Sequence, residues 1–156
     1  MKKIIIYFLL IASSAFVIAQ NKTTSNADCN VKEMRKEGVK VLSPFYYSSS
    51  KATEIEYRDT SYSKEIMVPM FKGESYRLIF NGKKLPAGVE INIYDRDNSH
   101  ANRKAVFSHS SSSSELIVYE PEVSKKYFIN YRIPAGSNLQ SSCIVFVIGY
   151  QLTFVK

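Results

Sequence analysis

The segment CIVFVIGYQLTF, residues 143–154, decides the fold class of this chain. Successive side chains of a β-strand point to opposite faces, so a strand over these residues has two distinct faces. The face that begins with Cys143, Val145 and Val147 is apolar at its start. The other face carries a large apolar or aromatic side chain at every second position, namely Ile144, Phe146, Ile148, Tyr150, Leu152 and Phe154. The segment therefore predicts a long strand at the centre of a sheet.

Shorter strand-like runs precede this segment. They cover residues 66–71, 76–80, 89–94, 104–108, 115–119 and 127–133. Asn81-Gly82 marks a turn, and Pro69 indicates an edge strand or a bulge because proline cannot donate a ladder hydrogen bond. The serine run at Ser108 and residues 110–114 predicts a loop. Together these features predict an all-β fold, an antiparallel, jelly-roll-like β-sandwich of about eight strands.

A short helix is expected ahead of the strands. Residues 29–38 are mostly good helix formers, Asp28 or Asn30 is placed to act as the N-cap, and Gly38 stands where the first residue after a helix is commonly glycine. Residues 20–28 are small and polar and predict a flexible leader. Residues 29–156 then form a single β-sandwich domain.

The first 19 residues have the pattern of a secretory signal peptide. Lys2 and Lys3 precede an apolar run, and Val17 and Ala19 occupy the −3 and −1 positions if cleavage falls between Ala19 and Gln20. That run is too short to cross a bilayer, and no later segment approaches the length required, so no transmembrane segment is expected. The sequence predicts a periplasmic or secreted protein.

The two cysteines, Cys29 and Cys143, fit an oxidising compartment. A disulfide between them is the simpler interpretation, and it would pin the helix against an edge or an end of the sandwich. Two buried thiols that never meet are the alternative.

Basic residues exceed acidic ones. The whole chain has a formal net charge of +7, of which Lys2 and Lys3 belong to the expected signal peptide. The densest basic stretch is interrupted by Glu33 and Glu37, and its basic residues are Lys32, Arg35, Lys36 and Lys40. We expect a solvated basic surface and no specific nucleic-acid partner. The oligomeric state does not follow from the sequence.

The sequence predicts no catalytic residue, no metal ligand and no cofactor. Asp95 opens a stretch that resembles a calcium loop, but His100 and Val106 replace the glycine and the glutamate that such a loop needs. No cysteine or carboxylate stands at a zinc-ligand spacing to His100 or His109. Carboxylates that converge from separate strands remain an alternative, and the candidates are Glu54, Glu56, Glu90, Glu115, Glu120 and Glu122.

Aromatic residues give the one compositional signal that points to a ligand. The chain has 11 tyrosines, 9 phenylalanines and no tryptophan. Tyrosines on an exposed face would stack on a sugar or a peptide, whereas tyrosines at the wet margin of a core would be structural. The candidate ligand-binding tyrosines are Tyr46, Tyr47, Tyr57, Tyr62, Tyr94 and Tyr119.

Four short segments carry a family resemblance. They are residues 73–78, 89–95, 124–129 and 149–152: GESYRL, VEINIYD, SKKYFI and GYQL. In this order they resemble strands of the bacterial pre-peptidase C-terminal domain, a jelly-roll-like β-sandwich of exported proteins. Lys125-Lys126 replaces the Gly-Thr of that pattern. The chain also resembles small exported proteins of the Bacteroidota. The resemblance implies a fold and transfers no site residue.

The sequence therefore favours an exported, non-catalytic binding or cell-envelope accessory module with a glycan or an envelope protein as its ligand. One alternative is a small secreted hydrolase built on separate carboxylates. A weaker alternative is an enzyme inhibitor, which would use the loop predicted at residues 108–114.

Overall fold

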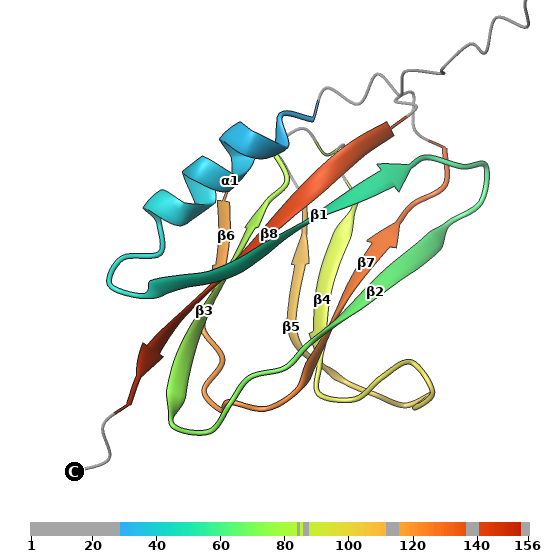
Figure 1. The fold of residues 1–156 in the computed structure, drawn as a ribbon. Helices are drawn as coiled ribbons and strands as arrows, with labels where there is room; N and C mark the ends of the chain where they lie inside the picture. The colour runs from blue at the N-terminus through green and yellow to red at the C-terminus, as the bar shows by residue number, and fades with distance from the viewer. Residues whose placement is uncertain (1–28, 84, 86–87, 112–115, 137–140, 154–156) are drawn as a thin grey trace, which may run out of the picture.

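One helix and eight strands form in the computed structural model, which describes residues 29–83, 85, 88–111, 116–136 and 141–153 (Figure 1). The helix α1 spans Val31–Lys40. The strands are β1 (Tyr46–Glu56), β2 (Tyr62–Val68), β3 (Glu74–Asn81), β4 (Glu90–Tyr94), β5 (Ala105–Ser110), β6 (Leu116–Tyr119), β7 (Tyr127–Ile133) and β8 (Ser141–Leu152). No helix among these described residues is long and apolar enough to cross a membrane.

The strands form two antiparallel four-stranded sheets, ordered β1-β8-β3-β6 and β2-β7-β4-β5. β1 pairs with β8, β2 with β7, β3 with β6 and β4 with β5, as if one long hairpin were wound around the core. This order is that of a jelly roll. The predicted all-β sandwich is therefore confirmed. β1 is an edge strand of the first sheet, and β2 is an edge strand of the second sheet.

The predicted central strand is β8, which lies between β1 and β3. Its inner face places Ile144, Phe146 and Ile148 in the main core between the two sheets. Its outer face places Cys143, Val145 and Val147 in a second, smaller core beneath α1. Both faces of β8 are thus buried over residues 142–149, as their apolar character predicts, whereas Gln151 and Leu152 at its end are exposed.

The helix covers a face of the first sheet, where it contacts β8, β3 and β1 (Figure 1). The prediction that it lies against an edge or an end of the sandwich is therefore wrong. The reason is the apolar outer face of β8, which needs a cover. Asn30 is the N-cap, and its side chain accepts a hydrogen bond from the Glu33 amide. Residues 1–28, with the predicted signal peptide, leader and Asp28, lie outside the described residues.

Gly38 lies inside α1, so its predicted role after the end of the helix is wrong. A Cβ atom at this position would lie 2.9 Å from the Cγ2 atom of Val147. Glycine is therefore required here by the close approach of α1 to β8, while Val41 caps the helix.

Polar contacts from β3 fix the helix to the sheet. The buried Asn81 side chain donates to the Met34 carbonyl (3.0 Å) and to the Glu37 carboxylate (2.9 Å). The Lys83 ammonium lies 2.6 Å from Glu37, and hydrogen bonds from Lys83 and Asn81 lower the pKa of that carboxyl. Arg77 donates to the carbonyls of residues 41–43 just after the helix. These contacts tie the helix and the residues that follow it to β3.

The Cys29–Cys143 disulfide is present, with the two Cα atoms 5.9 Å apart. It joins the residue ahead of the N-cap to the outer face of β8 and lies within the smaller core. The bond fits an oxidising compartment.

Two local features differ from the sequence pattern. No alternating run predicts β1, because its first half, residues 46–51, is polar on both faces and is held by pairing with β8. Ser108 and Ser110 lie in β5 and not in a loop, while residues 112–115 are outside the described range. Pro69 directly follows the edge strand β2, as predicted.

We expect replacement of both Cys29 and Cys143 by alanine to lower the free energy of unfolding by up to about 4–5 kcal/mol, the loop-entropy value for a closed loop of this length. Guanidinium unfolding of the variant and of the wild type, with and without a reductant, measures the loss. Reduced wild type should approach the variant. An unchanged midpoint in both samples would show that the bond contributes no stability.

Stability should fall at alkaline pH. Burial raises the pKa of Tyr57 to about 12, and it also raises the pKa of Tyr131, whose side chain is fully buried. A raised tyrosine pKa favours the neutral form in the folded state, so its contribution is complete below pH 10 and is lost above it. Urea unfolding from pH 8 to 11 should show a smaller alkaline loss for Tyr131→Phe, whereas Tyr46→Phe, at an exposed position, should follow the wild type. Equal slopes for all three proteins would refute the assignment.

Candidate functional site

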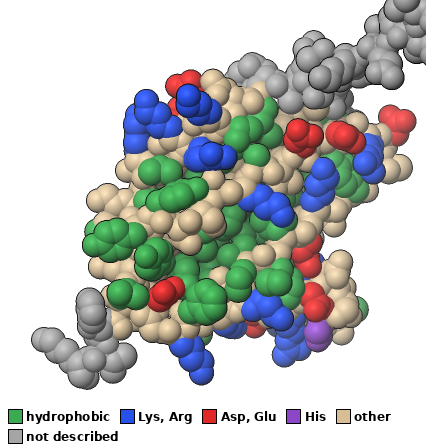
Figure 2. Space-filling model, viewed as in Figure 1, with side chains coloured by type: hydrophobic (Ala, Val, Ile, Leu, Met, Phe, Trp, Pro, Cys, Tyr) green, Lys and Arg blue, Asp and Glu red, His purple; other side chains and the backbone are tan. Residues whose placement is uncertain are grey.

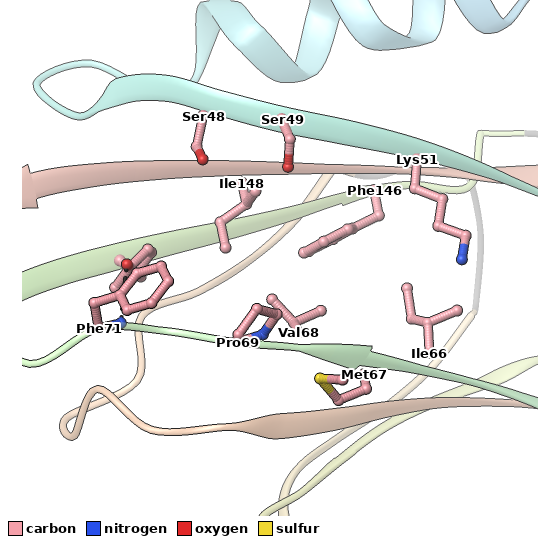
Figure 3. A pocket seen from close by; sticks show the side chains of 11 residues that line it. Ser48, Ser49, Lys51, Ile66, Met67, Val68, Pro69, Phe71, Phe146 and Ile148 are labelled. Carbon is pink, nitrogen blue, oxygen red and sulfur yellow. Dashed lines mark hydrogen bonds between the residues drawn. The ribbon is translucent and has the colours of Figure 1, made fainter.

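An apolar groove of about 270 Å³ opens between β1 of one sheet and β2 of the other. Both strands are edges, so the groove is the gap where the two sheets fail to close on each other. Figure 2 shows apolar side chains gathered in a hollow of this face, and Figure 3 shows how the lining residues lie. The lining comprises Ser48, Ser49, Lys51, Ile66, Met67, Val68, Pro69, Phe71, Tyr76, Phe146 and Ile148.

Side-chain contacts close one end of the groove. The Tyr62 hydroxyl donates to the Glu56 carbonyl (2.6 Å) and accepts from the Glu56 amide (3.0 Å). The Lys64 ammonium donates to the Glu54 carbonyl at 2.5 Å. These contacts hold β1 and β2 together next to the connection between them, and Figure 1 shows the two strands diverging from there.

The segment after β2 lines the other end of the groove. The Tyr76 hydroxyl donates to Glu74 and accepts from the Phe71 amide at 3.1 Å, which fixes the backbone of Phe71 beside the groove. The Phe71 side chain is 67% exposed, and Met67 on the rim is 56% exposed. Large apolar side chains that are exposed to solvent beside a groove are typical of a surface that binds a partner.

The floor of the groove belongs to the main core. Phe146 and Ile148 of β8 are almost fully buried, and Val68 of β2 faces them. Figure 3 shows these side chains pointing into the space between the strands. A ligand in the groove would therefore contact the core directly, without any loop between them.

Among the described residues, Lys51 is the one charged side chain that lines the groove. By alternation it belongs to the same face of β1 as the buried Thr53 and Ile55, but Lys51 itself is exposed. It lies opposite Phe146 in the register of β1 and β8. Within the described part of the chain, its ammonium has no ion pair or hydrogen bond. The groove thus combines an apolar floor with one unneutralised positive charge.

The edge of β1 offers unpaired backbone groups beside Lys51. The contacts of Glu54 and Glu56 with Lys64 and Tyr62 show that the even-numbered residues turn their N–H and C=O away from β8. Because the hydrogen-bonding side alternates along a strand, Ser50 and Ala52 turn theirs outward as well. Apart from the β1–β8 ladder, no backbone hydrogen bond joins Ser50 or Ala52 to another described residue.

The structure distributes the six candidate tyrosines over several elements. Tyr46 and Tyr47 are exposed at the start of β1, next to Ser48 of the groove, and the Tyr46 ring lies 6.1 Å from that of Tyr150. Tyr57 and Tyr62 pack partly buried against the main core at the closed end. A ligand-binding role for any of the six stays a prediction.

The other two tyrosines lie away from the groove. The Tyr94 ring lies 3.9 Å from the Arg103 guanidinium, which also forms a 2.6 Å ion pair with the mostly buried Glu65. The Tyr119 ring packs against Phe107 with 4.7 Å between centroids. These contacts occupy one face of each ring.

The stretch that resembles a calcium loop forms the turn between β4 and β5. Asp97 accepts hydrogen bonds from Ser99 and His100, and these bonds lower the pKa of its carboxyl to about 2. Asp95 pairs with Lys125 at 3.1 Å. Among the described residues, no three His, Cys, Asp or Glu side chains gather closely enough to hold a metal ion.

The carboxylates considered for hydrolysis lie on different parts of the fold. Glu54 and Glu56 lie two positions apart on the exposed face of β1. Glu90, at the start of β4, lies 3.5 Å from Arg132. Glu120 pairs with Arg77 at 2.6 Å. Glu122 is exposed between β6 and β7, and Glu115 lies outside the described residues.

The sequence indicates only part of this groove. Pro69 indicates the edge at β2, but no motif marks Lys51, Met67 or Phe71 as site residues. The one available signal is the spacing of Lys51, Thr53 and Ile55, which places a charge in line with two inward residues. Comparison with known proteins adds no further residue, because no protein-family model matches the chain and no curated protein matches it significantly.

An anionic apolar dye tests whether the groove accepts ligands. We expect anilinonaphthalene sulfonate to bind the folded protein, with its rings on the apolar floor and its sulfonate near Lys51. Phe71→Asp should weaken the fluorescence because it adds a negative charge at the mouth. The matched control is Val106→Asp, which changes a 45% exposed valine on β5. β5 is the edge strand opposite β2 in the second sheet, so this position is remote from the groove. Equal losses in both variants would place the dye elsewhere.

Proposed function

We propose that this chain is an exported, non-catalytic binding module that holds its ligand in the groove between β1 and β2. The observation that carries the proposal is the groove itself: exposed Phe71 and Met67 beside an apolar floor, with Lys51 unneutralised. Exposed apolar surface around a concavity is costly in water and is compensated when a ligand covers it.

A protein ligand is favoured over a glycan. The floor of the groove is apolar, and the edge of β1 offers backbone donors and acceptors that suit a peptide. The observation that favours a glycan is the exposure of Tyr46 and Tyr47, 68% and 46%, at the end of the same strand. A cell-envelope protein is therefore our first candidate for the ligand and a glycan our second.

We further propose that the protein acts in the periplasm or outside the cell after cleavage between Ala19 and Gln20. The disulfide and the signal-peptide pattern of residues 1–19 support this location. We also propose that the sandwich is similar to the pre-peptidase C-terminal domain. The four segments that carry this resemblance overlap β3, β4, β7 and β8.

The test is an unbiased search for ligands with the exported protein, residues 20–156. A random peptide-display library and a glycan array are probed at two salt concentrations with the wild type, Phe71→Asp and Val106→Asp. We expect peptides that are captured by the wild type and by Val106→Asp and lost with Phe71→Asp.

Other outcomes have distinct meanings. Glycan binding that survives Phe71→Asp and disappears with Tyr46→Ala or Tyr47→Ala would move the site to these tyrosines. Binding that vanishes at higher salt in every variant would reduce the signal to the net positive charge. A search that yields no ligand of either kind would refute the proposed function.

A further inference from the structure

We propose that the groove binds an extended peptide that adds to the edge of β1 as an antiparallel strand, with an acidic residue opposite Lys51 and a large apolar residue two positions later. This inference rests on the proposed function and specifies its ligand. It follows from the orientation of the β1 edge, the position of Lys51 and the shape of the groove.

The edge fixes where an added strand would pair. Ser50 and Ala52 direct their N–H and C=O away from β8, whereas Glu54 and Glu56 are already covered by Lys64 and Tyr62. On the other side, a bulge between Tyr47 and Ser49 interrupts the register. The open part of the edge is therefore short and centred on Lys51, so the incoming strand has one well-defined register.

The register determines which ligand side chain meets Lys51. Residues opposite Ser50 and Ala52 would exchange backbone hydrogen bonds with them and point their side chains to the outer face. The residue between these two forms a non-hydrogen-bonded pair with Lys51, in which the side chains of an antiparallel ladder come closest. Its side chain points to the inner face, as that of Lys51 does.

Charge complementarity selects an acidic residue at this position. Lys51 has no ionic partner among the described residues, and Phe146 beside it offers none. Opposite charges directly across two strands attract, and like charges repel. An aspartate or glutamate opposite Lys51 is therefore preferred over a neutral residue and over a lysine.

The shape of the groove places the apolar residue. An antiparallel strand runs from the closed end, near Glu54, toward the open end, near Ser49. The residue two positions after the acidic one then lies opposite Ser49, which pairs with Ile148. There it would fill the open end of the groove, which Val68, Pro69 and Ile148 line. The recognised pattern is acidic, any residue, large apolar.

An acyl chain with a carboxylate has the same charge and the same apolar character. It would, however, cover the N–H and C=O groups of Ser50 and Ala52 without pairing them, and burying unpaired backbone groups is unfavourable. A peptide strand pairs them. We therefore assign the groove to a peptide, and an acyl chain is an outcome of the test.

The experiment uses the exported protein, residues 20–156, and three capped nonapeptides. The first has aspartate followed two positions later by leucine in a threonine-rich, β-prone background. The second exchanges these two residues, and the third carries lysine in place of the aspartate. Fluorescence anisotropy measures affinity, and amide hydrogen exchange by NMR locates the contact.

We expect the first peptide to bind best and to slow amide exchange at Ser50 and Ala52. Lys51→Glu should prefer the lysine peptide over the aspartate peptide by about fivefold, which is the ratio that one favourable cross-strand charge pair gives. The matched control is Lys32→Glu, which makes the same charge change at an exposed position of α1 and should retain the wild-type preference.

Three outcomes would overturn the inference. Binding without protection of Ser50 and Ala52 would exclude strand addition. An unchanged peptide preference in Lys51→Glu would exclude the charge pair. Binding of laurate, with displacement of the dye and no binding of any peptide, would assign the groove to acyl chains and leave the proposed binding function intact. The proposed function is tested separately, by the unbiased search and its Phe71→Asp variant.

Discussion

The burial of β8 on both faces is the constraint on which the rest of the structure depends. Its inner residues, such as Phe146, complete the core between the sheets, and its outer residues, such as Val147, require a second cover. Burial of apolar surface on this scale is the main favourable term in folding. Because the cover is α1, the helix must lie on the face of the sheet, and Gly38 must be small enough for α1 to approach Val147.

Covering the outer face of β8 has a consequence at the edges of the sandwich. The helix is tied to β3 and β8 by Asn81, Arg77 and the disulfide, and so it protects the face of the first sheet but not its edge at β1. Tyr62 and Lys64 cover only the half of that edge next to the β1–β2 connection. The groove is therefore the part of the sandwich margin that neither the helix nor these two side chains reach.

The sequence predicts the parts of this fold that local patterns encode. Alternation in residues 143–154 predicts β8 and its central place, and Pro69 predicts the edge at β2. Contacts between distant residues are not visible in this way: Gly38 resembles a helix end, yet its role is set by Val147, 109 positions later. Likewise β1 has no apolar alternation over residues 48–51, and this part of the strand is held by its pairing with β8. The sequence pattern therefore does not predict the side of the groove that β1 forms.

Lys51 has two physical consequences that act together at the open edge. Edge strands invite pairing with other chains, and an inward-pointing lysine is one of the devices that discourage it. If two copies paired through β1 in the symmetric antiparallel register centred on Lys51, the two ammonium groups would face each other across the ladder, which is unfavourable. A strand with a carboxylate at that position meets the opposite condition. The same charge thus disfavours self-pairing and favours an acidic partner, and specificity of this kind arises from a repulsive contact as much as from an attractive one.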